Sequence, residues 1–213
     1  MSWSSVTEIV GFCLGVLYLY YEYKANARVW IVSLLMTLVS MQVYYSRGLY
    51  ADFAMNIYYV VMAVYGYVTW TFHLRKRKKP ELPIRRAGAG VLIWCAVALA
   101  GVYAVIAAWL ILFTDSTVPY FDAFTTAMSI IATWMLARKY VQQWLAWLAV
   151  DAVCVGLYAY KGIYLYAILY GAYTVVAWLG YRKWLRLMYK AETDSNKEMN
   201  SDAEESVKTM NND

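Results

Sequence analysis

The chain has 213 residues, of which 62% are hydrophobic, 18% aromatic and 15% charged, and its formal net charge is +5. A soluble domain carries about 25% charged residues. Here the apolar residues form continuous blocks of about 17–24, long enough to cross the hydrocarbon core of a bilayer, which is roughly 30 Å thick. The composition therefore excludes a soluble globular protein, and the absence of apolar–polar alternation excludes a membrane β-barrel. The predicted fold class is an all-α polytopic membrane protein.

Block length and flanking charge predict seven transmembrane helices. In chain order they cover residues 7–23, 29–46, 51–72, 88–112, 121–137, 141–160 and 163–186. Cys13, Cys95 and Cys154 all fall in apolar blocks, so we predict free, buried thiols. The N-terminal segment lacks the basic stretch and small-residue cleavage pattern of a signal peptide, so none is expected.

Basic residues orient these helices. The run Arg75–Lys79 and the pair Arg85 and Arg86 lie between the third and fourth predicted helices. Cytoplasmic loops are enriched in such residues. We therefore predict an N-terminus outside the cell and a C-terminus in the cytoplasm. The tail from Glu192 onward is rich in Ser, Asn, Asp and Glu, and we predict that it is disordered.

The sequence contains an internal repeat. A shift of 114 residues superimposes SRGLYADFAMNIYYVVMAVYGYVTW (46–70) on YKGIYLYAILYGAYTVVAWLGYRKW (160–184) without a gap. The matched pairs are Gly48 with Gly162, Tyr50 with Tyr164, Tyr59 with Tyr173, Gly66 with Gly180, Trp70 with Trp184 and, outside these stretches, Trp30 with Trp144. The repeat predicts two three-helix bundles of the same orientation, a 3+1+3 arrangement typical of transporters whose substrate binds between the repeats.

This repeat divides the chain into four parts. The first bundle covers residues 1–73 and the second covers residues 121–190. Residues 74–120 form the basic cytoplasmic loop and the linking fourth helix, and residues 191–213 form the acidic tail.

Asp151 is a carboxylate near the middle of the sixth predicted helix. A charged residue there costs about 2.5–3.5 kcal/mol on insertion scales, and such residues face a bundle interior or a water-filled cavity. Trp144, Trp147 and Tyr158 share its helix face by their spacing. Trp144 also suits an interfacial anchor, because it lies near the cytoplasmic end, whereas Trp147 is deeper.

Three other helix faces carry polar and aromatic residues at helical spacing. They are Trp30, Ser33, Thr37 and Tyr44; Asp52, Asn56 and Tyr59; and Tyr166, Tyr170 and Tyr173. We predict a cavity shared by the four faces. Its predicted substrate-binding residues are Trp144, Trp147, Asp151, Tyr158, Asn56, Tyr59, Thr37, Tyr170 and Tyr173. Aromatic walls stack flat heterocycles and attract cations, and a desolvated carboxylate favours a cationic or amine-bearing solute.

In these residues the sequence resembles the PnuC-type vitamin transporters. Their sixth helix carries a W-x-x-W-x-x-x-N pattern, here filled by Trp144, Trp147 and Asp151, and the resemblance covers most of residues 8–186. It implies a 3+1+3 PnuC-like fold in the bacterial inner membrane. It also implies facilitated diffusion of a B-vitamin without ATP or ion coupling, trapping by a cytoplasmic vitamin kinase, and assembly as a homotrimer.

Residue 151 departs from the family pattern and directs the prediction of the substrate. An asparagine can pair with both edges of the carboxamide of nicotinamide riboside. An aspartate instead suits the amine and the fixed positive charge of thiamine. We therefore predict thiamine, as in the PnuT branch that the sequence resembles most, and keep nicotinamide riboside and riboflavin as alternatives.

Other classes of protein fit the sequence less well. No enzyme is expected, because His73 is the one histidine and no catalytic motif is present; no cofactor, metal ion or nucleic-acid partner is expected either. A retinal protein needs a lysine deep in its last helix, and residues 163–181 contain none. A SWEET-like transporter of small solutes shares the parallel repeat and stays open. Proton coupling through Asp151 also stays open, with Glu22 as the other ionisable candidate within the spans.

Overall fold

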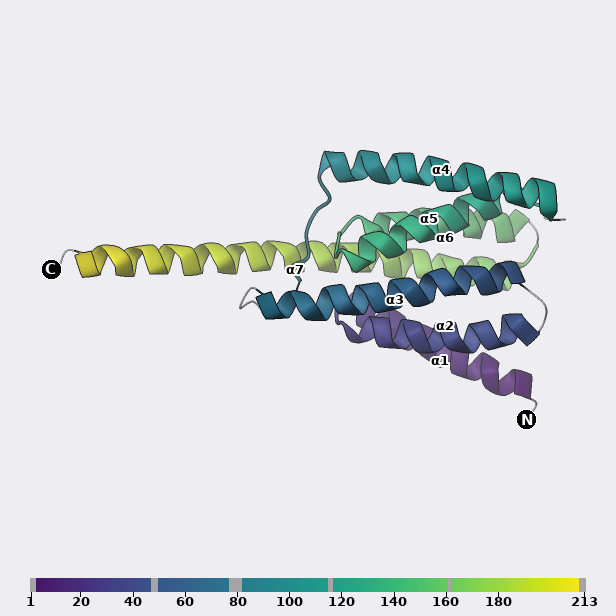
Figure 1. Cartoon of the computed structure of the whole chain (residues 1–213), viewed down its shortest axis with the longest axis horizontal. Helices are drawn as coiled ribbons and strands as arrows, with labels where there is room; N and C mark the ends of the chain where they lie inside the picture. Colours follow the sequence, from purple (N-terminus) through teal and green to yellow (C-terminus); the bar gives the residue numbers. More distant parts are fainter. Residues whose placement is uncertain (1–2, 47–49, 77–81, 115–116, 161, 211–213) are drawn as a thin grey trace.

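A computed structural model describes residues 3–46, 50–76, 82–114, 117–160 and 162–210 of the chain. Within these residues the chain forms seven α-helices that run side by side along one axis (Figure 1). They are α1 (Trp3–Tyr23), α2 (Arg28–Ser46), α3 (Tyr50–Lys76), α4 (Ala89–Phe113), α5 (Pro119–Ala137), α6 (Gln143–Tyr160) and α7 (Tyr164–Met210). The boundaries agree with the predicted ones to within four residues, except at the end of α7.

The outer surface of the helices is apolar, as a bilayer requires. The most apolar window of α4 has a mean hydropathy of 2.5 and is only 11% buried. Its Ile93, Val97, Val105 and Leu112 side chains are 64–71% exposed. A helix that is hydrophobic all round suits a membrane span. The fold is therefore that of an all-α polytopic membrane protein.

By length and composition alone, two helices in the described part of the chain, α4 and α6, are long and apolar enough to cross a bilayer. The other helices include tyrosine, threonine and serine residues among their apolar ones. They still present apolar side chains outward: Val61 and Val64 of α3, and Leu165, Ile168 and Val175 of α7, are more than half exposed. These helices therefore also have surfaces suited to lipid.

α7 continues well beyond the other helices, so the C-terminus lies far from the bundle (Figure 1). The tail from Glu192 was predicted to be disordered, but the structure continues the helix to Met210. Residues 181–210 contain neither glycine nor proline. Once the bundle has nucleated α7, nothing in this segment breaks the helix, because propagation is far easier than nucleation.

The backbone of two turns confirms the internal repeat. Ala25, in the turn between α1 and α2, and Lys139, in the turn between α5 and α6, both have a φ of 53°. Non-glycine residues rarely adopt this left-handed conformation. The Ala25 N–H donates to the Glu22 carbonyl at 2.9 Å, and the Lys139 N–H donates to the Leu136 carbonyl at 2.9 Å. These pairs are 114 residues apart, which is the shift seen in the sequence.

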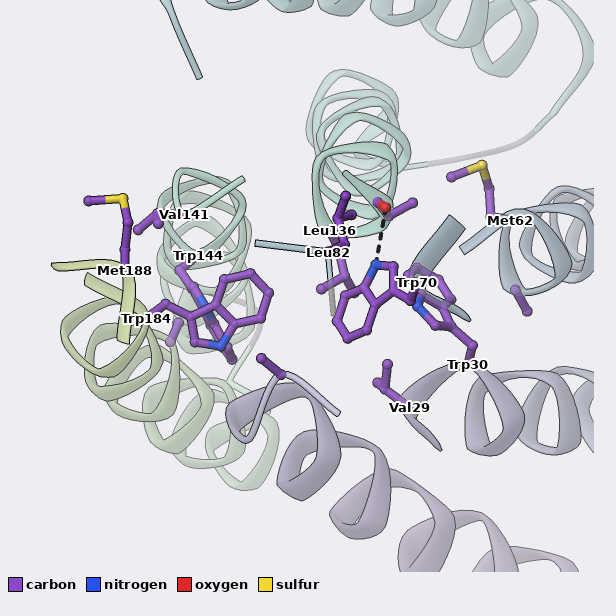
Figure 2. Packing of buried hydrophobic residues seen from close by; sticks show 14 residues of the cluster. Val29, Trp30, Met62, Trp70, Leu82, Leu136, Val141, Trp144, Trp184 and Met188 are labelled. Atoms are coloured by element: carbon purple, nitrogen blue, oxygen red, sulfur yellow. Dashed lines mark hydrogen bonds between the residues drawn. The ribbon is translucent and has the colours of Figure 1, made fainter. Parts of the chain in front are cut away.

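Two matched tryptophan pairs form the core of the bundle (Figure 2). Trp30 and Trp70 pack edge to face with ring centroids 5.7 Å apart, and Trp144 and Trp184 pack in the same way at 5.8 Å. All four side chains are almost completely buried. Edge-to-face packing is a preferred arrangement of aromatic rings, so each repeat builds the same buried wedge between two of its helices.

A glycine accommodates each wedge. A Cβ atom placed on Gly180 would lie 2.6 Å from the Trp144 ring, and one placed on Gly66 would collide with the Trp30 ring. Carbon atoms pack best at about 3.5–4.0 Å. These two positions therefore need glycine so that the tryptophan ring can lie directly on the helix backbone.

The two repeats are joined by crossed hydrogen bonds. The Trp70 indole N–H donates to the Ala137 carbonyl of α5 at 3.1 Å, as the dashed line in Figure 2 shows. The Trp184 indole N–H donates to the Glu22 carbonyl of α1 at 3.1 Å. The rings of Trp70 and Trp184 lie 6.4 Å apart. The second tryptophan of each repeat thus binds the C-terminal end of the first helix of the other repeat.

The segment between α3 and α4 is docked onto the turn between α5 and α6. The Arg85 N–H donates to the Lys139 carbonyl at 3.1 Å, and the Val141 N–H donates to the Arg85 carbonyl at 3.0 Å. The Gln142 side chain accepts from the Ala87 N–H at 2.9 Å and donates to the Ala87 carbonyl at 3.2 Å. The end of the basic loop is therefore attached to the start of α6.

Candidate functional site

Asp151 lies inside the bundle, with 7% of its surface exposed. It is eight residues from the first residue of α6, about 12 Å along the helix axis. Its carboxylate interacts electrostatically with Glu22 of α1, Cys154 of α6 and Tyr170 of α7. None of these neighbours is cationic. A carboxylate in such surroundings would be stabilised by a positively charged or hydrogen-bond-donating ligand.

Tyrosine rings of α6 and α7 form a stack next to Asp151. The Tyr158 ring lies 5.3 Å from that of Tyr170 at an angle of 16°, and 5.3 Å from that of Tyr166 at 30°. Tyr170 and Tyr173 pack edge to face at 5.8 Å. The structure thus brings together four of the predicted site residues, Asp151, Tyr158, Tyr170 and Tyr173, in an aromatic and acidic cluster.

The first repeat contributes to the same region through α1 and α3. The Tyr18 side chain of α1 interacts electrostatically with both Glu22 and Tyr59. Tyr59 packs edge to face against Tyr58 at 5.4 Å. Asn56, three residues before Tyr59 on α3, is 8% exposed. Tyr59 of α3 is therefore linked to the carboxylates of this region by way of Tyr18 of α1, a helix that the sequence-based site did not include.

The predicted face of α2 is less well connected. Thr37 is 7% exposed, and its hydroxyl donates to the Ser33 carbonyl of its own helix at 2.8 Å. The described contacts do not bring Thr37 to Asp151. The side chains of Tyr44 and Asp52, also placed on predicted faces, lie outside the part of the chain that the structure describes.

Trp144 and Trp147 occupy different environments on α6. Trp144 is 2% exposed and wedged between Gly180 and Trp184, so it is not the interfacial anchor that its sequence position suggested. Trp147 is only partly buried against the same core. The indole N–H of each ring has no hydrogen-bond partner among the described residues. Substrate contact by either ring stays a prediction, and Trp147 is the better placed of the two.

Glu22 and Gln143 form a buried polar pair between α1 and α6. Glu22 is 2% exposed and Gln143 is 0% exposed. The Gln143 amide is a hydrogen-bonding neighbour of the Glu22 carboxylate. The contact is loose, because by distance and angle Glu22 Oε1 and both polar atoms of the Gln143 amide make no complete hydrogen bond within the described part of the protein. Most buried polar groups in proteins are hydrogen-bonded. These atoms are therefore available to a ligand or to water.

Glu22 was predicted only as a candidate proton carrier, and Gln143 and Tyr18 were not among the predicted site residues. A helical signal was present for both. Gln143 lies four residues before Trp147 and eight before Asp151, and Tyr18 lies four residues before Glu22. Local spacing does not predict which residues of α1 and α6 become neighbours in the folded chain.

The described side chains include no group of three or more His, Cys, Asp or Glu residues that could hold a metal ion. Cys95 and Cys154 are buried free thiols, but Cys13 is exposed and was wrongly predicted to be buried. Because Cys13 lies on α1 among exposed apolar residues such as Val16 and Leu17, its small side chain suits a lipid-facing position.

Comparison with known proteins shows what this chain is similar to. Residues 5–186 match the nicotinamide mononucleotide transporter family. The nicotinamide riboside transporter PnuC of Escherichia coli (strain K12) is 23% identical over 167 residues, covering 67% of this chain and 70% of that protein. The riboflavin/roseoflavin transporter RibM of Streptomyces davaonensis is 31% identical over 186 residues, covering 84% of each.

The fold is also similar to a crystal structure of the vitamin B3 transporter PnuC. The TM-score is 0.66, the sequence identity is 22%, and the match covers 87% of this chain and 83% of that one. At this identity the likeness concerns the fold.

Proposed function

The chain belongs to the nicotinamide mononucleotide transporter family, and on this premise we propose that it carries nicotinamide riboside across the membrane. The buried carboxylate of Asp151 beside the tyrosine stack supports a cationic vitamin, and the nicotinamide riboside transporters among the relatives favour this vitamin over thiamine. Nicotinamide riboside has a flat, positively charged ring, which suits both an aromatic wall and an anionic neighbour. The names of the relatives, nicotinamide riboside and riboflavin transporters, support a vitamin of this kind.

Thiamine and riboflavin are the second candidates, each for a separate reason. Thiamine rests on residue 151 alone, because an aspartate there suits an amine and a fixed cation. Riboflavin rests on the 31% identity to RibM, although a neutral flavin makes less use of the Asp151 carboxylate. A SWEET-like function is set aside by the family membership.

The transport mechanism that we propose is facilitated diffusion. The two three-helix halves, 1–73 and 121–190, would move relative to each other about the buried tryptophan pairs. This movement would expose the site to each side of the membrane in turn. A vitamin kinase in the cytoplasm would trap the transported vitamin by phosphorylating it. We also propose residence in the bacterial inner membrane with the N-terminus outside, and a homotrimeric assembly.

Calorimetric titration of the purified protein tests the substrate. The wild type and Asp151→Asn would be titrated with nicotinamide riboside, thiamine and riboflavin, with the exposed Glu192→Gln as the matched control. We expect nicotinamide riboside to bind. Asp151→Ala, titrated alongside, should weaken its binding by about tenfold or more, because a hydrogen bond to a charged group contributes about 1.5–3 kcal/mol. Asp151→Asn should retain it, because an asparagine can pair with the carboxamide of this ligand. The control should bind like the wild type.

Other results would redirect the assignment. Binding of thiamine alone, lost in Asp151→Asn, would replace nicotinamide riboside by thiamine. Binding of riboflavin that is insensitive to residue 151 would remove the carboxylate from substrate selection. If no vitamin binds, the proposed function is wrong.

Flux into proteoliposomes tests the coupling. We expect substrate to equilibrate without accumulating, whether or not a pH gradient is imposed. Accumulation of unmodified vitamin driven by the pH gradient, and lost in Asp151→Asn, would establish proton coupling instead.

A further inference from the structure

The polar pair of Glu22 and Gln143 is unusual for its place in the protein. Both side chains are at most 2% exposed, and three of their polar atoms have no hydrogen-bond partner among the described residues. The two groups contact each other only loosely. Incomplete hydrogen bonding of buried polar atoms is unfavourable, so the pair has capacity to bind a further polar group, from a ligand or from water.

The internal repeat shows that the fold itself does not need polar residues here. A shift of 114 residues relates Glu22 to Leu136 and Gln143 to Val29. Leu136 and Val29 are both completely buried in the hydrophobic core. The same structural positions are therefore filled by apolar side chains in the other half of the protein. Packing alone does not account for Glu22 and Gln143.

Neighbouring contacts hold the pair in place. The Glu22 carbonyl accepts a hydrogen bond from the Trp184 indole, which fixes the end of α1 against α7. Trp184 also packs on Trp144, the residue that follows Gln143 at the start of α6. A binding site needs polar groups with this kind of support.

The pair lies at one end of a row of groups on α6. Gln143, Trp147 and Asp151 follow one another at intervals of four residues, so they lie on one side of the helix. The distance from Gln143 to Asp151 along the axis is about 12 Å, which suits a ligand of nucleoside size. Glu22 interacts with both ends of the row. A substrate whose ring lies near Asp151 and Trp147 would extend its other end toward Gln143.

We propose that Glu22 and Gln143 form a second subsite, which binds the hydroxyl groups of a ribose or ribityl chain on the substrate. A carboxylate accepts hydrogen bonds from two hydroxyls, and a primary amide both donates to and accepts from them. The inference rests on the proposed function, because it assigns to the same vitamin a ring end at Asp151 and a polyhydroxyl end at this pair. It also favours nicotinamide riboside and riboflavin over thiamine.

The test compares two ligands that share a ring and differ in the sugar. Nicotinamide riboside and 1-methylnicotinamide would be titrated into the wild type, the isosteric Glu22→Gln, and the double variant Glu22→Leu with Gln143→Val. The double variant copies the residues of the other repeat. Glu192→Gln, an exposed glutamate on the extension of α7, is the matched control for Glu22→Gln.

We expect the double variant to bind nicotinamide riboside at least tenfold more weakly, to bind 1-methylnicotinamide as the wild type does, and to melt at the same or a higher temperature. The last result is expected because replacing both partners of a buried polar pair by apolar groups is often neutral or stabilising. Glu22→Gln should show a smaller loss for nicotinamide riboside only. If the wild type binds riboflavin instead, riboflavin and lumiflavin form the corresponding pair of ligands.

Three outcomes would overturn the inference, and they are distinguishable. If the wild type binds none of these ligands, the proposed function fails and the subsite fails with it. If the wild type binds but the variants keep full affinity for the sugar-bearing ligand, only the subsite is wrong. If the double variant loses stability, or loses both ligands equally, the pair has a structural role.

Discussion

Gly180→Ala is the most direct test of how α6 and α7 pack within the second repeat. The added Cβ atom would lie 2.6 Å from the Trp144 ring, about 1 Å closer than carbon atoms pack. The ring cannot move away easily, because it is 2% exposed and packs against Trp184 with centroids 5.8 Å apart. Overpacking of this kind costs about 1–3 kcal/mol.

Replacing glycine by alanine in a helix also stabilises it by about 1 kcal/mol, which obscures the effect of a single variant. Gly171→Ala on the same helix removes this difficulty. It makes the same gain, and its Cβ would have no neighbour within 4 Å. The difference between Gly180→Ala and Gly171→Ala is therefore the overpacking cost alone, about 1–3 kcal/mol.

Intrinsic tryptophan fluorescence during heating in detergent measures this difference. At about 2–4 °C per kcal/mol for a chain of this size, Gly180→Ala should melt roughly 2–12 °C below Gly171→Ala. Gly66→Ala should behave like Gly180→Ala, because its Cβ would collide with Trp30. Equal melting temperatures for Gly180→Ala and Gly171→Ala would show that Gly180 does not confine the Trp144 ring, and the reasoning would fail.

Three further changes probe single contacts. Trp184→Phe removes the donor to the Glu22 carbonyl and should cost about 1–3 kcal/mol of stability, seen as a lower melting temperature; an unchanged value would mean that another donor replaces it. Gln142→Leu removes both hydrogen bonds to Ala87, so limited trypsin digestion should cleave the preceding basic loop faster than in the wild type; equal rates would contradict the docking of this loop. Ala25→Gly relieves a left-handed backbone worth about 1–2 kcal/mol at an entropic cost of about 0.5–1 kcal/mol, so thermal melting should show an unchanged or slightly raised midpoint, and a clear decrease would contradict the assigned turn.

Much of the architecture follows from local sequence. Helix position depends on runs of apolar residues and on the turns between them, both of which involve neighbours along the chain. The repeat is readable because the same pattern occurs twice, and the shared conformation of Ala25 and Lys139 reproduces its shift of 114 residues. Asp151 can also be recognised without the fold, because it is a carboxylate within a run of apolar residues.

The environment of each site residue could not be predicted in this way. Trp144 shares a helix face with Asp151, but its surroundings depend on Gly180 and Trp184, which reach it only when α7 packs on α6. The segment from Glu192 was predicted to be disordered, but it continues α7. Its polar composition shows that it is compatible with water, but not whether a helix already formed upstream continues through it.

The membrane class, the helices, the repeat and the buried carboxylate were all predicted correctly, because each depends on residue type and local spacing. The tertiary structure decided that the tryptophans pack the repeats together and that Glu22 meets Gln143, 121 residues away. Whether a buried polar atom has a hydrogen-bond partner depends on neighbouring helices, and these come together only in the folded chain.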